Sequence, residues 1–232
     1  MHPEEQPDGV WVAGLTRCSA AKATRFLGEA AAEKRLYRHL AREHARESRE
    51  SYVEIDAPLE LYALVRLLRP RHVVEVGVSS GVSSAYLLDA LDRNGVGTLH
   101  SVDLPTFPRR TAPRPSRGGS WTLPPGRASG WAVPLWLRKR WDLRLGDKAV
   151  VLPLLAEELP EVGLFVYDVP HRDVTSFGEF LSLDPRMSAG SVAIADHGPT
   201  GELCTALQRW AGTRRGTPLR RQGLGLFGFR LN

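Results

Sequence analysis

The fold is decided by the stretch HVVEVGVSSG at residues 72–81. Residues 72–76 are a short run rich in β-branched side chains, a glycine turn follows, and residues 82–91 have the composition of a helix. This order predicts a strand, a tight loop and a helix. A second strand is predicted at residues 98–103, beyond the turn at residues 94–97, and it completes a βαβ unit.

The same alternation continues toward the C-terminus. Further strands are predicted at residues 142–145, 164–168 and 191–196, and helical segments at residues 133–140, 147–159, 176–183 and 202–210. The last strand candidates, residues 219–221 and 225–231, are joined by too few residues for a crossover helix and should pair antiparallel. We therefore predict an α/β fold, a Rossmann-like, doubly wound, mostly parallel seven-stranded sheet with an antiparallel C-terminal strand.

The N-terminal part has a different character. Residues 1–18 show no clear period and are expected to form an arm, either loose or laid over the surface. Residues 19–50 favour amphipathic helices, and residues 58–68 favour a shorter one. We predict an N-terminal arm and helical cap over residues 1–69, before a core domain at residues 70–232.

Within the core domain, residues 105–130 form a long stretch of Pro, Arg, Gly and Ser. Such a length without periodic structure is typical of a lid or mobile insert. Trp131, Trp136 and Trp141 follow this insert and Trp121 lies within it. These side chains either form an apolar wall for an aromatic substrate or pack the insert onto the core.

Composition limits the classes of protein that remain. A chain of 232 residues with 42% hydrophobic side chains suits one folding unit. No apolar run is long enough to span a membrane and the first residues do not resemble a signal peptide, so we expect a cytoplasmic location. The 2 cysteines are isolated and indicate neither a disulfide framework nor a cysteine metal site.

The net charge of +5 is unevenly distributed. Residues 104–141 contain eight basic residues and no acidic one, so the excess is local. It could serve an anionic substrate or an acidic partner, or have no role. Because no nucleic-acid-binding motif accompanies it, we expect no nucleic-acid partner.

The loop after the first strand is the candidate cofactor site. In open α/β sheets, ligands bind beyond the carboxyl ends of the strands at such a point. Glycines let the backbone approach a ligand, and the helix that follows offers unpaired N–H groups. We assign cofactor binding to Glu75, Gly77, Ser79, Gly81 and Ser83.

Two later strand ends complete this site. Asp103 ends the second strand, where a carboxylate can accept hydrogen bonds from both hydroxyls of a ribose. Gly146 and Asp147 follow the third strand and are placed to cover an adenine. The dinucleotide fingerprint G-x-G-x-x-G is absent, which disfavours a nicotinamide-dependent oxidoreductase.

Over roughly residues 70–232 the chain resembles the class I S-adenosylmethionine-dependent methyltransferases. In that family the first loop reads E-x-G-x-G-x-G, and this chain keeps Glu75, Gly77 and Gly81 but has Ser79 at the middle glycine. The resemblance implies S-adenosylmethionine as the cofactor and makes residues 70–232 the domain that binds it.

The ends of the fourth and fifth strands carry the candidate reaction centre. Asp168 ends one strand and is followed three residues later by His171, while Asp196 and His197 end the other. Asp168, Asp196 and His197 could hold Mg²⁺ or a similar divalent cation, which would bind and acidify a substrate hydroxyl. Asp168 also faces the cofactor site, and His171 is the candidate general base.

This arrangement resembles metal-dependent O-methyltransferases of the catechol type and bacterial natural-product methyltransferases that act on macrolide sugars and cephamycin precursors. Asp168 and His171 match the first part of their pattern. His197 stands where those families have an oxygen ligand, so a transition metal or no metal stays open. If no metal binds, Asp168 and Asp196 are ordinary polar strand ends that face the cofactor pocket.

The resemblance implies an S-adenosylmethionine-dependent methyltransferase that acts on a hydroxyl of a small molecule, with or without a metal. Two alternatives stay open. One is a non-catalytic accessory protein with the methyltransferase fold, and the other is a metal-independent enzyme that methylates nitrogen or a macromolecule. We expect no membrane partner, and a homodimer is left open.

Overall fold

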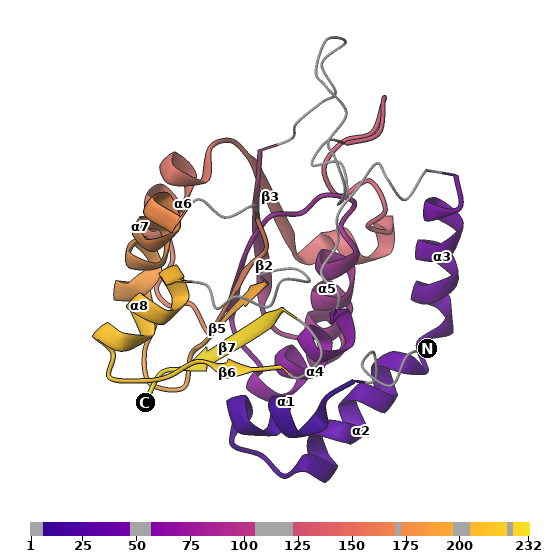
Figure 1. The fold of residues 1–232 in the computed structure, drawn as a ribbon. Coiled ribbons are helices and arrows are strands. Elements are labelled where there is room, and N and C mark those ends of the chain that lie inside the picture. Colours follow the sequence, from indigo (N-terminus) through magenta and orange to yellow (C-terminus); the bar gives the residue numbers. More distant parts are fainter. Residues whose placement is uncertain (1–6, 47–56, 105–122, 170–172, 197–204, 222–224) are drawn as a thin grey trace.

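The computed structural model describes residues 7–46, 57–104, 123–169, 173–196, 205–221 and 225–232 (Figure 1). They contain one seven-stranded sheet in the order β3-β2-β1-β4-β5-β7-β6. The strands are β1 (His72–Val76), β2 (Thr98–Asp103), β3 (Trp141–Leu145), β4 (Leu164–Tyr167), β5 (Val192–Asp196), β6 (Leu219–Arg220) and β7 (Leu226–Arg230). Neighbouring strands from β1 to β5 are parallel, and β7 runs antiparallel to β5 and β6. The predicted fold is confirmed.

Helices cover both faces of the sheet (Figure 1). The helices of the first half are α1 (Gly9–Thr16), α2 (Ala20–Ala31), α3 (Lys34–His44), α4 (Pro58–Leu68) and α5 (Val82–Asn94). Those of the second half are the 3₁₀ helix η3 (Leu135–Arg140), α6 (Lys148–Glu158), α7 (Asp173–Leu183), the 3₁₀ helix η4 (Asp184–Arg186) and α8 (Thr205–Thr213). Within the described residues, no helix is both long enough and apolar enough to cross a bilayer.

Alternation along the strands divides the interior into two cores. In β1, Val73 packs with α1, α2, α4 and α5, while Val74 and Val76 pack with α6, α7 and α8. Side chains of period two point to opposite faces, so a strand covered on both sides reads as a nearly continuous apolar run. This is why the central strands were recognisable in the sequence.

The expectation of an N-terminal arm, either loose or laid over the surface, is wrong for residues 9–16. They form α1, whose first turn is capped by the Asp8 carboxylate through the N–H groups of Val10 and Trp11. Trp11 is buried and its indole N–H donates to the Leu219 carbonyl at 2.9 Å. Because a helix of this length is marginal alone, contacts distant in sequence must stabilise it.

The helical prediction for residues 19–50 is refined as well. The helical stretch is interrupted at Ala32, which separates α2 from α3. Residues 47–50 lie outside the described residues. In the predicted insert, residues 105–122 also lie outside them. The remainder, residues 123–130, is built of turns, with Leu123 and Ser129 buried.

Leu15 tests whether α1 belongs to the core. Its side chain is fully buried, and a β-carbon on Gly228 of β7 would lie 2.5 Å from Leu15 Cδ1. We expect Leu15→Ala to lower the free energy of unfolding by about 2–5 kcal/mol in urea denaturation, because it leaves a cavity. Val10→Ala, in the same helix but 74% exposed, should change it by less than about 0.5 kcal/mol. If both variants changed the free energy of unfolding by the same small amount, α1 would be a surface arm and not part of the core.

Candidate active site

The loop between β1 and α5 has an unusual backbone. Gly77 and Gly81 have φ angles of +92° and +94°, and Ser79 has +49°. A β-carbon on Gly77 would overlap the carbonyl oxygen of Asp168, so the loop runs directly against the end of β4. Gly77 is therefore required, whereas Ser79 occupies a left-handed conformation that a side chain can adopt at some strain.

Glu75 lies beneath this loop and is fully buried. Its carboxylate accepts hydrogen bonds of 2.6 Å from each of three hydroxyls, those of Ser83 and Ser84 in α5 and Ser101 in β2. Burial raises the pKa of Glu75, although the three hydroxyl donors oppose the shift. Two residues assigned to cofactor binding, Glu75 and Ser83, thus bind each other and fix the loop on its strand and helix.

Asp103 lies at the end of β2 beside the loop. The Val78 N–H donates to its Oδ1 at 3.3 Å, and the Ser129 hydroxyl donates to its Oδ2. Burial raises the pKa of Asp103, with the Ser129 hydroxyl and the backbone N–H groups of Val78 and Leu104 opposing the shift. The Gly146 N–H donates to the Asp103 carbonyl at 2.9 Å, which joins the ends of β2 and β3. The structure therefore brings the predicted ribose carboxylate to the glycine loop.

Asp147 stands at the next strand end and is exposed. It is the N-cap of α6, where its Oδ1 accepts a hydrogen bond of 2.9 Å from the Ala149 N–H. This capping contact is a sufficient reason for an aspartate at this position, even if Asp147 binds no ligand. Its role at an adenine stays a prediction.

Asp168 and Asp196 follow paired positions of neighbouring strands. Tyr167 of β4 is in register with Ala195 of β5, and the aspartates come next along each strand. Asp196 is 8% exposed, and the Asp168 N–H donates to the Val76 carbonyl at 2.8 Å. The two side chains therefore belong to one edge of the sheet, the edge that carries Asp103.

The histidines predicted for this centre, His171 and His197, lie outside the described residues. Among the residues that the structure describes, no group of three His, Cys, Asp or Glu side chains could hold a metal ion. The metal site and the general base stay predictions.

Sequence reasoning missed the contacts that close the loop from above. The N–H groups of Gly130 and Ala132 donate to the carbonyls of Ser79 and Ser80, each at 2.9 Å. The end of the insert is thus bonded to the glycine loop as a short backbone ladder. No local pattern could reveal it, because the partners are about fifty residues apart in the chain.

Helix α3 was also missed as part of the site. His44 Nδ1 lies 2.9 Å from the Leu40 carbonyl and Nε2 lies 3.1 Å from the Ser80 hydroxyl. Since a carbonyl can only accept, neutral His44 carries its proton on Nδ1 and the Ser80 hydroxyl donates to Nε2. A second α3 histidine, His39, donates from Nε2 to the Ala132 carbonyl at 3.1 Å.

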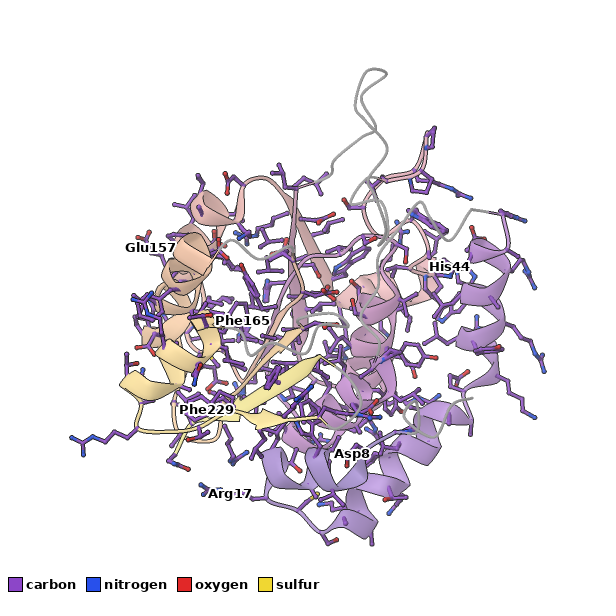
Figure 2. All side chains as sticks on the ribbon, viewed as in Figure 1. Asp8, Arg17, His44, Glu157, Phe165 and Phe229 are labelled. Carbon is purple, nitrogen blue, oxygen red and sulfur yellow. The ribbon has the colours of Figure 1, made fainter. Side chains whose placement is uncertain are left out.

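Two of the tryptophans after the insert reinforce α3. Trp131 packs edge-on against His44 with ring centroids 5.1 Å apart, and Trp136 packs likewise against His39 at 5.0 Å. The guanidinium of Arg35 lies 4.1 Å from the Trp136 ring centroid. Figure 2 labels His44 beside α3, on the side of that helix that faces the rest of the protein. These tryptophans pack the segment after the insert onto α3, one of the two roles expected from the sequence.

Comparison with known proteins decides the family. The profile of a methyltransferase domain matches residues 74–197, which is more than half of the chain. The chain belongs to the methyltransferase domain family. The class I methyltransferase assignment made from the glycine loop is confirmed. A search among curated proteins finds no match.

Solved structures share the fold of this methyltransferase. A Klebsiella pneumoniae protein provisionally named an O-methyltransferase superposes with a TM-score of 0.59 at 16% identity, over 86% of this chain and 90% of its own. The Podospora anserina methyltransferase PaMTH1, bound to S-adenosylhomocysteine, gives 0.56 at 14% identity, over 86% and 88%. The Streptomyces achromogenes O-methyltransferase TomG, in complex with S-adenosylmethionine, gives 0.55 at 16% identity, over 86% and 91%.

The glycine loop offers a paired test of backbone strain. We expect Ser79→Gly to keep the free energy of unfolding within about 1 kcal/mol of the wild type, because relieved strain offsets the added entropy of the unfolded chain. Gly77→Ala should lower it by at least about 2 kcal/mol, because the new β-carbon has no room beside Asp168. Thermal unfolding of both variants measures this, and tolerance of Ala at position 77 would contradict the loop geometry.

Glu75 makes stability depend on pH. Because its pKa is raised in the folded state, the native protein binds this proton more tightly than the unfolded chain does. The resulting stabilisation is complete below about pH 4.5 and declines as the pH rises toward the folded value. Relative to Glu75→Gln, the wild type should therefore lose stability in urea titrations as the pH rises above about 4.5. A difference that stays constant, or grows with pH, would refute this.

Proposed function

We propose that this methyltransferase transfers the methyl group of S-adenosylmethionine to a hydroxyl oxygen of a small molecule. The observation that carries the proposal is the Asp103 carboxylate, which lies at the glycine loop and accepts hydrogen bonds from the Val78 N–H and the Ser129 hydroxyl. A carboxylate at this strand end suits the two hydroxyls of a ribose. The Ser129 hydroxyl already bonds to one oxygen in the way that a ribose hydroxyl would.

The remaining cofactor contacts follow from the same loop. Residues 77–81 and the first N–H groups of α5 would face the methionine part, while Gly146 and Asp147 would lie along the adenine. Gly77 is needed for close approach, and Glu75 and Ser83 hold the loop in place. When bound, S-adenosylmethionine supplies an electrophilic methyl group.

The protein's own part in the reaction is to orient, shield and deprotonate. We assign the acceptor to the edge where Asp168 and Asp196 end their strands. His171 would accept the proton that the acceptor hydroxyl loses. The segment bonded to Ser79 and Ser80, together with residues 105–122, would cover the acceptor and exclude water. Residues 1–69 would form a cap on the cofactor domain at residues 70–232.

A divalent cation at Asp168, Asp196 and His197 would strengthen this chemistry by lowering the pKa of the bound hydroxyl. The donor set of two carboxylates and one imidazole suits Mg²⁺ less than an all-oxygen set would. A chelator effect on activity, reversed by added Mg²⁺ or Mn²⁺, would support the metal.

The choice of a small-molecule acceptor has support from neighbours of the same fold. TomG is an enzyme of tomaymycin synthesis, and another neighbour, CalS11, is a calicheamicin methyltransferase with a TM-score of 0.55 at 16% identity. Both names refer to small natural products. No described segment resembles a nucleic-acid-binding motif that would favour a macromolecular acceptor instead.

Calorimetric titration with S-adenosylhomocysteine tests the cofactor site. Asp103→Asn should weaken binding about 10- to 100-fold, because charge-assisted hydrogen bonds contribute about 1.5–3 kcal/mol. Ser129→Ala should leave the affinity equal or higher, since it frees one oxygen of Asp103. Asp92→Asn, at the far end of α5, is the matched control.

Each outcome of this titration has a definite meaning. If Asp103→Asn bound S-adenosylhomocysteine with unchanged affinity, Asp103 would not be part of the cofactor site. Tight binding by the wild type without turnover of any hydroxylated acceptor would favour the non-catalytic accessory protein over the enzyme.

A further inference from the structure

A groove lies at the amino ends of the parallel strands, opposite to the cofactor loop at their carboxyl ends. Its cavity volume is about 440 Å³, within the range of small-molecule sites. Its walls include residues 69–71 before β1, residues 161–163 before β4 and residues 188–191 before β5. Parallel strands begin at this edge, so the groove is at the amino ends of the strands, whereas Asp103 and Asp168 are at the carboxyl ends.

Positive charge dominates the groove. Arg69, Arg71 and Arg230 line it, together with one acidic residue, Glu161. In the part of the chain that the structure describes, none of these three arginines forms an ion pair with a carboxylate. Arginines elsewhere do find such partners, for example Arg214 with Asp184 at 2.6 Å. The groove is therefore an unneutralised basic site, not one end of a set of salt bridges.

Arg230 lines the groove from the sheet itself. It ends β7, where it is in register with Val192, and its Nη1 donates to the Leu15 carbonyl at 3.1 Å. Its Nε is buried and has no hydrogen-bond partner among the described residues. Burial and the nearby Arg17 guanidinium lower the pKa of Arg230. Because this Nε is closed to solvent, a ligand in the groove would meet the Arg230 guanidinium at its terminal nitrogens, and the Nε–H would report that contact from within the same guanidinium group.

The glycine opposite Arg230 keeps the groove open at this point. Gly190 has a φ angle of +96°, and a β-carbon there would lie 3.3 Å from Arg230 Nη2. The rest of the lining includes apolar side chains, among them Leu67, Leu68 and Pro70. A ligand with an anionic end and a compact neutral body would match both parts.

We propose that this groove binds an oxyanion, and specifically a phosphate group, to which Arg71 and Arg230 present their guanidinium groups while Arg69 adds charge. Guanidinium groups suit phosphate because their planar forks donate two parallel hydrogen bonds. The phosphate is either the free ion or the anionic end of a small phosphorylated molecule. The site is independent of the methyl-transfer chemistry at the other edge of the sheet.

The test follows the Arg230 Nε–H resonance by ¹H–¹⁵N NMR, assigned by its loss in Arg230→Lys. Addition of inorganic phosphate at constant ionic strength should shift it in a saturable way, with a dissociation constant on the order of 1 mM or tighter. Phenyl phosphate that binds more tightly would identify a phosphorylated molecule as the ligand class, and equal affinity would identify the free ion. No saturable shift with either probe, beyond that given by chloride, overturns the proposal.

Variants locate the site. Arg71→Met, which changes an exposed side chain, should weaken phosphate binding about tenfold, while Arg25→Met on α2 should leave it unchanged. Binding of S-adenosylhomocysteine should be the same in all three proteins, which separates failure of this site from failure of the cofactor site. If both methionine variants lost phosphate affinity equally, the binding would reflect general surface charge, and the proposed phosphate site in the groove would be refuted.

Discussion

The carboxylate of Glu75 is the constraint on which the rest of the site depends. A fully buried carboxylate is expensive to desolvate, and here three serine hydroxyls compensate it from two other elements. The network extends further, because the Trp141 indole N–H donates to the Ser101 hydroxyl at 2.9 Å and the Trp141 ring packs against Gly130. Gly130 in turn bonds to the glycine loop. The loop, three neighbouring strands and the end of the insert therefore form one connected unit.

This closed arrangement gives the cofactor loop two supports, one below and one above. From below, Glu75 fixes the start of α5 onto β1 and β2. From above, His44 bonds to Ser80, and the segment at residues 130–132 bonds to the loop backbone. A change in the position of α3 must therefore affect the same loop that would hold the cofactor. The structure thereby couples a helix outside the sheet to the candidate site.

The two edges of the sheet carry opposite chemistry. The carboxyl edge presents Asp103, Asp168 and Asp196, as expected for a site that binds hydroxyls or a cation. The amino edge presents the arginines of the groove, with Glu161 as the acid in its lining. The separation follows from topology, since the parallel strands all begin at one edge and end at the other. Two ligands of opposite preference could thus bind one sheet without competing.

The sequence by itself determined the strands and helices of the domain at residues 70–232 and their order. Apolar runs of strand length, glycine turns and short connections fixed the parallel core and the antiparallel tail, because each is a local property of the chain. It also located Gly77 and Asp103 at strand ends. Tertiary structure alone decided that residues near Trp11 belong to the core, that Glu75 faces serines, and that His44 bonds to Ser80. These contacts join positions far apart in the chain, and no periodicity specifies which distant side chain fills a buried hydrogen bond.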